Sequence, residues 1–550
     1  MKTYFTLLIL LLGYPLISLC QTGPGGVGSK NGASNLILWM DANTVAGTNG
    51  STITSWDDAS GYNHNFTVGN GAVLTKPAQN GNAAFTFDGG SNYFERAYTA
   101  ALSPTDFTVF TTANVTDNAG YKALLSNRDD NASTAGYILY AQPTDNFWTF
   151  WTGSVGNSWD QLSSGISTQG TWASQMLTYE TASGTKEISI LQGAVLSNSG
   201  TTVTPNAAQP IRIGAGNNEG APDFYFEGSI GEVIIYNTVL NNAQRIIVQN
   251  YLSAKYDYAL TSDDLYIQDN PANGDYDHDV AGIGRVDAAN LHTDAQGNGI
   301  VRILNATDLG DNEFLLWGHD NGQQEARDNS DVPLGVESRF IRVWRVNEVN
   351  AGGSAVDVGS IDMRWDLNNL GNVTASDLRL LIDTDNDGSF ADETPISGAT
   401  ALGGGIYAFA GVSTLGNNMR FTLATTNLLQ TPLPINLSSF SATPVNKKQV
   451  LVSWKTSTET NNAYFTVLRS KDNISWEEVK VIPGAGNSSV PISYSIVDDF
   501  PYSGISFYRL KQTDINSNFT YSAIKSVNLK KSANFNVSIY PNPAVEELII

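Results

Sequence analysis

The sequence predicts an all-β protein: a jelly-roll sandwich, then a second β-rich domain, then an immunoglobulin-like sandwich. Short runs that alternate with a period of two begin near residue 36, for example at residues 107–115, 186–190 and 211–213. Turns rich in Gly, Asn, Asp and Ser separate these runs. One clear helical pattern, near residues 241–256, interrupts them.

Composition supports several folded domains and excludes some partners. A chain of 550 residues with 41% hydrophobic residues can bury cores, and its length suggests roughly three or four domains. The chain has 53 acidic and 30 basic residues, for a formal net charge of −23. So acidic a surface repels phosphate, which argues against nucleic-acid binding and against anionic membranes, and it attracts cations.

The first twenty residues have the pattern of a secretory signal peptide. Lys2 precedes an apolar run at 4–12, and the small residues Ser18 and Cys20 favour cleavage before Gln21. The run is shorter than the ~20 residues of a membrane span, and no other stretch approaches that length, so we expect no transmembrane segment. The prediction is an exported protein, either secreted or attached to the outer membrane at the cell surface. A lipoprotein acylated at Cys20 is the alternative.

The jelly-roll domain is predicted at residues 35–256, after a flexible, glycine-rich lead-in at residues 21–34. Asn241 or Asn242 can cap the helix that closes this domain. Its apolar residues follow i, i+4 spacing and predict a narrow stripe that packs on a sheet: Ile247, Val248, Tyr251, Leu252 and Tyr256.

A second β-rich domain is predicted at residues 257–427. Its strand-like runs are residues 314–318, 340–346 and 378–382.

A stiff linker containing Pro is predicted at residues 428–434, followed by an immunoglobulin-like sandwich at residues 435–530. The runs at 450–454, 465–469 and 506–511 alternate cleanly. About seven such strands in about 100 residues are typical of this architecture.

Residues 36–41, 55–61, 85–89 and 226–236 together resemble a LamG-like domain of the concanavalin A-like jelly-roll class. The resemblance covers residues 35–256 and implies a domain that binds a glycan or a protein. Fold analogy alone does not give function.

Two further resemblances lie toward the C-terminus. Trp454 with residues 507–514 and 521–522 resembles a fibronectin type III-like module. Residues 538–544 resemble the opening of the C-terminal sorting domain of the type IX secretion system of Bacteroidota-type bacteria, and we expect residues 531–550 to be its truncated start. This resemblance implies secretion and sorting machinery as partners.

The middle region resembles an uncharacterised domain of surface proteins through residues 276–285 and 316–319. That resemblance implies no known activity.

The acidic segment at residues 383–388 predicts a structural calcium site. Asp383, Asp385 and Asp387 alternate and Gly388 follows, as in the first half of an EF-hand loop. Without a cation, three carboxylates this close repel each other. The main-chain carbonyl of Ser389 is a candidate ligand at the seventh position.

The twelfth position of the acidic segment is Thr394, where an EF-hand has a bidentate Glu. Asp392 or Glu393 would have to substitute for it, and we expect Phe390 to anchor the loop in the core. An acidic hairpin turn without a metal is the alternative.

A second alternating set of aspartates comprises Asp275, Asp277 and Asp279. These residues either bind a second cation or are solvent-facing residues of a turn. We expect His278 and His319 to be structural. The chain lacks the His and Cys spacing of a zinc site.

The candidate ligand-binding residues are Trp148, Phe150 and Trp151 in the aromatic run at 147–151. Alternation places Trp148 and Phe150 on one face, and Phe147 and Trp151 on the other. One face must be core, and the other is either core or an aromatic platform for the apolar faces of sugar rings. We expect Trp39 and Trp56 to be core residues.

The best candidates for a glycosidase pair are Glu227 and Glu232. Such chemistry needs two carboxylates about 5–5.5 Å apart in retaining enzymes. On an unbulged strand, residues five apart point to opposite faces, so we predict no catalytic residue.

The sequence thus predicts an exported, non-catalytic binding or adhesion protein, with an extracellular glycan or protein as its partner and calcium in its β domains. The alternatives are a structural surface or matrix protein without a small ligand, and a hydrolase or accessory protein acting on polysaccharide.

Overall fold

The computed structural model describes residues 21–529, apart from 118, 130–133, 144–146, 219, 323–326, 369, 371–372, 429–436, 446–447, 457–458, 474, 489–491, 515–518 and 523. The predicted signal peptide with Cys20, the sorting segment at 531–550 and most of the linker lie outside the described residues. Within the described part of the chain, no helix is long and apolar enough to cross a membrane.

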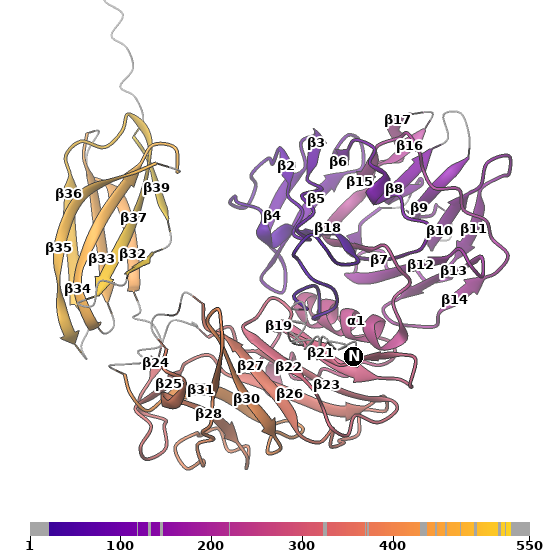
Figure 1. The fold of residues 1–550 in the computed structure, drawn as a ribbon. Coiled ribbons are helices and arrows are strands. Elements are labelled where there is room, and N and C mark those ends of the chain that lie inside the picture. The colour runs from indigo at the N-terminus through magenta and orange to yellow at the C-terminus, as the bar shows by residue number, and fades with distance from the viewer. Residues whose placement is uncertain are drawn as a thin grey trace, which may run out of the picture. The chain divides into compact units, whose positions relative to one another are not determined.

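The predicted all-β class is confirmed (Figure 1). Among the described residues, α1 (Asn242–Tyr256) is the one α-helix, and strands form nearly all other regular structure. The chain divides into two compact units. The first comprises residues 1–322, 342–366 and 380–422, and the second comprises residues 323–341, 367–379 and 423–550.

The jelly roll consists of two large antiparallel sheets. The first has the order β14-β13-β12-β7-β18-β5-β4, and β1 also pairs with β18. Its strands are β1 (Leu36–Asp41), β4 (Val73–Gln79), β5 (Asn82–Asp88), β7 (Phe107–Val115), β12 (Ala173–Glu180), β13 (Thr185–Ile190), β14 (Leu196–Asn198) and β18 (Glu227–Tyr236).

The second sheet has the order β11-β10-β9-β8-β15-β6-β3-β2, and β16 and β17 form a separate hairpin. Its strands are β2 (Ser55–Trp56), β3 (Phe66–Asn70), β6 (Tyr93–Arg96), β8 (Lys122–Asp129), β9 (Ala135–Ala141), β10 (Trp148–Gly153), β11 (Asp160–Ser163) and β15 (Ile211–Ile213). The hairpin strands are β16 (Gly216–Asn218) and β17 (Ala221–Asp223).

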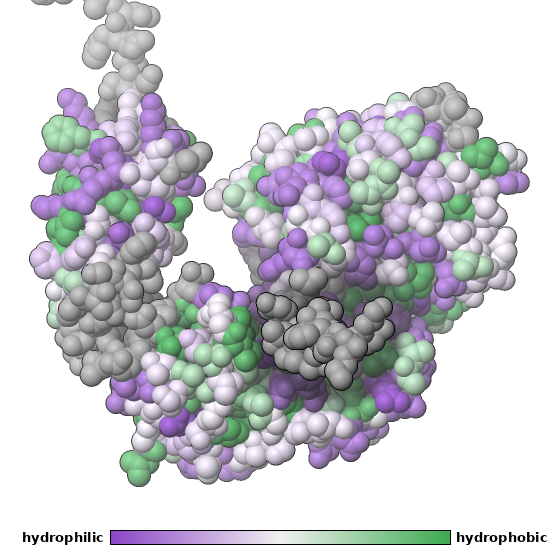
Figure 2. Space-filling view, in the orientation of Figure 1, coloured by the Kyte–Doolittle hydropathy of each residue, from purple (hydrophilic) through white to green (hydrophobic). Residues whose placement is uncertain are grey.

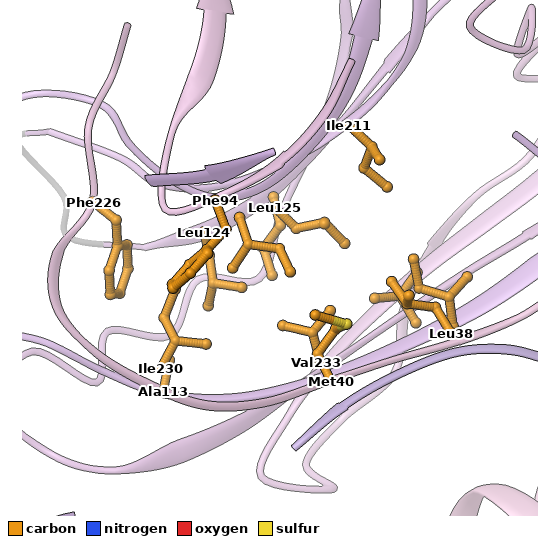
Figure 3. Close-up of a cluster of buried hydrophobic side chains, with 14 of the residues drawn as sticks. Leu38, Met40, Phe94, Ala113, Leu124, Leu125, Ile211, Phe226, Ile230 and Val233 are labelled. Carbon is orange, nitrogen blue, oxygen red and sulfur yellow. The ribbon is translucent and has the colours of Figure 1, made fainter. Parts of the chain in front are cut away.

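The core of the jelly roll fills the space between its two sheets. Figure 3 shows Met40 and Val233 on one side of this core and Phe94 and Leu125 on the other. Each residue is buried, because strand alternation turns every second side chain inward. The prediction that Trp39 and Trp56 are core residues is confirmed, with 1% and 0% of their surface exposed.

A β-bulge changes the facing of residues along β18. The register between β18 and β7 shifts between Ile230 and Glu232, at Gly231. Ile230 and Val233 therefore both face the core, although they are three residues apart. The same bulge places Glu227 and Glu232 on one face, so the expectation of opposite faces is wrong.

The helix α1 begins where the sequence predicts. Asn241 is its N-cap and forms a capping box with Gln244. The helix is buried on more than the predicted stripe, because it contacts both β12 of the jelly roll and β19 (His278–Arg285) of the next sheet. Its polar residue Asn250 accepts hydrogen bonds from the main-chain N–H groups of Leu265 and Tyr266.

The glycine-rich segment at residues 23–28 is buried, so the expectation of a flexible lead-in is wrong. Gly25 forms a bridge with Ala281. The carbonyl of Gly26 accepts a hydrogen bond from His292, and that of Val27 accepts one from the Tyr236 hydroxyl. Glycines let this backbone approach its neighbours closely.

Two sheets follow α1. The first has the order β20-β19-β23-β26-β31-β25-β24, with β28 paired to β31, and the second has the order β21-β22-β27-β30-β29. The predicted strand at 340–346 is two strands, since residues 341–343 interrupt it. The remaining strands are β20 (Leu291–His292), β21 (Asp294–Ala295), β22 (Val301–Leu304), β23 (Glu313–His319), β24 (Arg327–Asp328), β25 (Ser338–Phe340), β26 (Trp344–Asn350), β27 (Ile361–Asp366), β28 (Leu378–Asp383), β29 (Thr400–Gly403), β30 (Ile406–Val412) and β31 (Arg420–Thr425).

The last domain is a sandwich of two sheets around Trp454. The sheets have the orders β32-β33-β36 and β35-β34-β37-β38, with β39 paired to β37. Trp454, Phe465 and Tyr508 lie in its core. Its strands are β32 (Leu437–Pro444), β33 (Val450–Thr456), β34 (Glu459–Ser470), β35 (Trp476–Ser488), β36 (Ile492–Asp498), β37 (Gly504–Asp514), β38 (Phe519–Tyr521) and β39 (Lys525–Leu529).

Candidate functional site

The aromatic run on β10 divides between two environments. Trp148 and Phe150 are both 0% exposed and belong to the core between the sheets. The Trp148 indole N–H donates to the Thr168 hydroxyl at 2.8 Å. The prediction that these two residues bind a ligand is therefore wrong, because their rings are enclosed by the core. Trp151 faces the other way and is only partly buried.

Trp151 belongs to an aromatic cluster on the outer side of β8, β9 and β10. We call this cluster the aromatic face; its residues are Tyr121, Arg128, Tyr140, Trp151, Trp159 and Phe224. The Tyr140 and Trp151 ring centroids lie 5.4 Å apart, and those of Tyr121 and Trp151 lie 5.5 Å apart, both edge to face. Trp159, just before β11, approaches Trp151 with a centroid distance of 6.5 Å.

A cation lies among these rings. The Arg128 guanidinium is 5.0 Å from the Trp159 ring centroid and 5.8 Å from that of Phe224. Its Nη1 also donates to the Tyr140 hydroxyl at 3.1 Å. These contacts hold the guanidinium against aromatic surface at a cation–π distance.

Phe224 reaches the cluster from a strained backbone. Its φ of 52° lies in the left-handed region, which an aromatic residue adopts at a cost of about 1–3 kcal/mol. Its carbonyl accepts a hydrogen bond from the Ala123 N–H at 2.8 Å, which ties it to β8. Tertiary contacts thus fix Phe224 beside Tyr121 and Tyr140.

The aromatic face is available to solvent in part. Tyr121, Arg128, Trp151, Trp159 and Phe224 are all of intermediate burial, whereas Tyr140 is buried. The indole Nε1 of Trp151 is enclosed and has no hydrogen-bond partner among the described residues. A patch of rings with polar donors between them can accept a flat ligand that has apolar faces and hydroxyl edges.

Glu232 is enclosed in a charge network beneath α1. It is 0% exposed, and the Trp39 indole N–H donates to it at 2.6 Å. Lys255 Nζ lies 2.7 Å from Glu232 and 2.8 Å from Asp41. Burial raises the pKa of Glu232. Burial alone would lower the pKa of Lys255. The carboxylates of Asp41 and Glu232 outweigh that effect, so the pKa of Lys255 lies well above its usual value.

Glu227 is engaged elsewhere, with Lys122 Nζ 3.2 Å from its carboxylate. Although the bulge puts Glu227 and Glu232 on one face, the enclosed Glu232 has no side open to a substrate. The arrangement gives no support to the glycosidase pair.

A polar pocket of about 210 Å³ lies beside the Lys255 network. Asp277, His278 and Asp279 line it together with Asp41 and Tyr251. Within the described residues, Asp275, Asp277 and Asp279 do not form a cation-binding group.

Both histidines predicted to be structural contact aspartates at this pocket. His278 pairs with Asp277. Burial alone would lower the pKa of His278. The hydrogen bond to Asp277 and the nearby carboxylates outweigh burial, so the pKa of His278 is raised. His319 accepts from the Asn321 N–H at Nδ1 and contacts Asp279 through Nε2 at 3.0 Å, so Nε2 carries its proton. Burial lowers the pKa of His319.

The acidic loop after β28 brings three of its predicted metal ligands together. Ligand oxygens of Asp383, Asp385 and Asp387 all lie within 4.8 Å of one another. Glu393 is not part of this group, because its carboxylate accepts from the Thr384 N–H at 2.6 Å and from the Thr384 hydroxyl. Asp392 is exposed and also lies outside the group.

The predicted anchor of the acidic loop is confirmed: Phe390 is 2% exposed.

Two protein families match parts of the chain. Residues 88–244 match the concanavalin A-like lectin/glucanases superfamily. This match agrees with the LamG-like resemblance of the jelly roll. Residues 244–418 match a domain of unknown function, DUF8202. No curated protein matches the chain.

Several solved structures are similar to the chain at low identity and with low TM-scores. Domain 4 of AbnA, a GH43 extracellular arabinanase from Geobacillus stearothermophilus, in complex with arabinotriose, is 15% identical (39% of this chain, 97% of that chain, TM-score 0.31). The CBM40 of the Ruminococcus gnavus IT-sialidase, bound to α2,6-sialyllactose, is 14% identical (27% and 86%, TM-score 0.24). The binding domain of botulinum neurotoxin DC, in complex with SialylT, is 13% identical (85% and 95%, TM-score 0.31).

Proposed function

We propose that this chain is an exported, non-catalytic carbohydrate-binding protein, and that the aromatic face of the jelly roll is its binding site. The observation that carries the proposal is the set of partly exposed rings, Trp151 and Trp159 above all, outside a sandwich that already has a closed core. These rings are not needed to fill that core. The match of residues 88–244 to a lectin and glucanase superfamily supports the same reading.

The chemistry of the aromatic face suits a sugar. The C–H groups of a pyranose or furanose ring can stack on Trp151 or Trp159, while Arg128 and the Tyr121 hydroxyl can bond to the ring's hydroxyls. The face of the jelly roll seen in Figure 2 carries its hydrophobic residues in small, separate groups among hydrophilic and near-neutral ones. That surface favours a polar ligand over an extensive apolar protein partner.

The enclosure of Glu232 supports a role without catalysis. Its carboxylate is already bonded to Lys255 and Trp39, and the other predicted carboxylate, Glu227, pairs with Lys122. A hydrolase would need both carboxylates at an open cleft.

Sequence signals support the proposal that the protein is exported and is then either retained at the cell surface or released. Residues 1–20 carry the signal-peptide pattern, and residues 531–550 carry the resemblance to a sorting domain. We propose that the last sandwich, with its fibronectin type III-like motif, acts as a spacer between the jelly roll and that segment. N-terminal mass spectrometry of the protein recovered outside the cells should find Gln21 first; an intact Met1 would contradict this part of the proposal.

A glycan array probed with the purified full chain tests the binding proposal. It should include neutral oligosaccharides and oligosaccharides containing uronic or sialic acid. We expect binding to at least one class, and loss of that binding in Trp159→Ala. A blank array, or a Trp159→Ala signal equal to the wild type, would instead favour a structural matrix role.

A further inference from the structure

The acidic loop between β28 and Phe390 holds a buried carboxylate oxygen that has no hydrogen-bond partner among the described residues. Asp383 ends β28 and is 0% exposed. Its Oδ2 lies 2.6 Å from Arg420 Nη2 and accepts from the Gly388 N–H at 3.2 Å. Its Oδ1 is enclosed and has no hydrogen-bond partner within the part of the chain that the structure describes. A buried acceptor without a donor or cation destabilises the folded state, and a bound cation would remove that penalty.

The other two carboxylates of the group lie beside that of Asp383. Asp385 and Asp387 are exposed, and each offers an oxygen within 4.8 Å of the Asp383 ligand oxygen and of each other. The exposed side leaves room for water molecules, which complete the coordination of many protein-bound ions. One ligand is thus buried and the others are open to solvent.

The two arginines near the loop do not neutralise it. Arg420 pairs with Asp383, and Arg345 Nη2 donates to the Asn386 side-chain carbonyl at 3.3 Å. Residues 383–393 carry five carboxylates against these two guanidinium groups. Because Arg420 occupies only Oδ2 of Asp383, a cation can bind Oδ1 while the ion pair persists.

We propose that this loop binds one calcium ion through Asp383 Oδ1, Asp385, Asp387 and the main-chain carbonyl of Ser389, with water completing the shell. The donor set is all oxygen, which suits calcium and gives no thiolate or imidazole to zinc. Calcium also tolerates an irregular, partly hydrated shell, whereas magnesium demands near-ideal octahedral geometry.

The proposed donor set differs from the predicted one at its last position. Glu393 already accepts two hydrogen bonds from Thr384, so it fixes the start of the loop in place of the bidentate ligand of an EF-hand. Losing that ligand weakens binding. We therefore expect affinity in the range of extracellular modules, about 10⁻⁴–10⁻³ M.

Calorimetric titration of the chelator-treated full chain with calcium chloride tests the proposal. We expect one site in the wild type and a tenfold or greater loss of affinity in both Asp385→Asn and Asp387→Asn. Asp385 and Asp387 are exposed, so their substitution should not disturb the fold. Asp383→Asn is avoided because it removes the buried partner of Arg420 and can unfold the domain. A titration with magnesium chloride should give at least tenfold weaker binding.

The matched control is Asp308→Asn, which removes an exposed carboxylate from a different loop of the same region. It should leave calcium affinity within twofold of the wild type, and circular dichroism should show all three variants folded. No heat from the wild type, unchanged affinity in Asp385→Asn and Asp387→Asn, or an equal loss in Asp308→Asn would each overturn the calcium site. None of these outcomes bears on glycan binding, because the acidic loop follows β28, which lies in a different sheet from the strands β8, β9 and β10 of the aromatic face.

Discussion

At the scale of single residues, the positive charge of Lys255 stabilises the contact between the jelly roll and α1. Its side chain is 13% exposed and compensates two carboxylates, of which Glu232 is fully enclosed. Removing one partner of a buried pair leaves an uncompensated charge, which is far more costly than breaking a surface pair. The network is therefore a structural requirement of this face.

We expect Lys255→Met to lower the free energy of unfolding by about 3–5 kcal/mol, because it leaves Glu232 and Asp41 without their cation. Urea unfolding followed by fluorescence measures this. Arg285→Met is the control, since Arg285 pairs with Asp311 at a surface where both side chains are at least 35% exposed. The control should cost about 0–1 kcal/mol; equal costs would contradict the account of Lys255.

Glu348 gives the protein a pH dependence close to neutrality. It is 1% exposed and accepts from the Val358 N–H at 2.6 Å, and burial raises its pKa to about 7. A raised carboxyl pKa means that the folded state holds the proton more tightly. The resulting stability is present below the unfolded value of 4.5 and is lost as pH rises through about 7.

We therefore expect Glu348→Gln, whose amide oxygen can still accept the Val358 hydrogen bond, to remove this part of the pH dependence. The wild type should lose stability relative to the variant between pH 5 and pH 8, as measured by the unfolding midpoint in urea. A constant difference across that range would show that Glu348 does not titrate there.

At the scale of elements, the glycine-rich segment at residues 23–28 is a buried part of the fold. Gly26 has a φ of +85°, and a Cβ built on it would lie 2.5 Å from the Cβ of Ala295. Composition alone cannot distinguish such a segment from a flexible one, because glycine serves both close approach and flexibility. The hydrogen bonds that distinguish them come from residues far along the chain, such as His292 and Tyr236.

Gly26→Ala should destabilise the protein by about 1–3 kcal/mol more than Gly50→Ala. Gly50 has nearly the same φ, +83°, but no atom lies within 4 Å of its added Cβ, so it isolates the backbone cost from the steric one. Thermal unfolding of the two variants measures the difference. Equal midpoints would contradict the close packing of the segment.

The bulge at Gly231 is the element that the sequence pattern could not reveal. A single extra residue in a strand moves every later side chain to the opposite face of the sheet. The only local sign of this bulge in the sequence is a glycine within a strand. It brings Glu232 to the helix side of the sheet, where Lys255 and Trp39 enclose it. A prediction from ideal alternation therefore gave the wrong facing for one member of the carboxylate pair.

At the scale of the whole molecule, local patterns predicted the all-β class, the helix with a cap at Asn241 or Asn242, and the position of the acidic loop. They did so because strand alternation, capping and turn chemistry are local. The aromatic face was predicted only through Trp151. Its other members, such as Trp159 and Phe224, come from separate segments, which reach Trp151 and β8 only through tertiary contacts.

Carbohydrate binding at the aromatic face is the central claim, and a calorimetric comparison of two tryptophan variants tests it most directly. The ligand is the strongest glycan found on the array. Trp159→Ala removes a ring of the aromatic face, whereas Trp172→Ala removes another ring of intermediate burial, which stacks on Tyr256 in the same domain.

We predict that Trp159→Ala weakens binding at least tenfold, equivalent to about 1.4 kcal/mol, while Trp172→Ala stays within twofold of the wild type. Equal affinities in the two variants, or a larger loss in Trp172→Ala, would contradict the assignment of the binding site to the aromatic face.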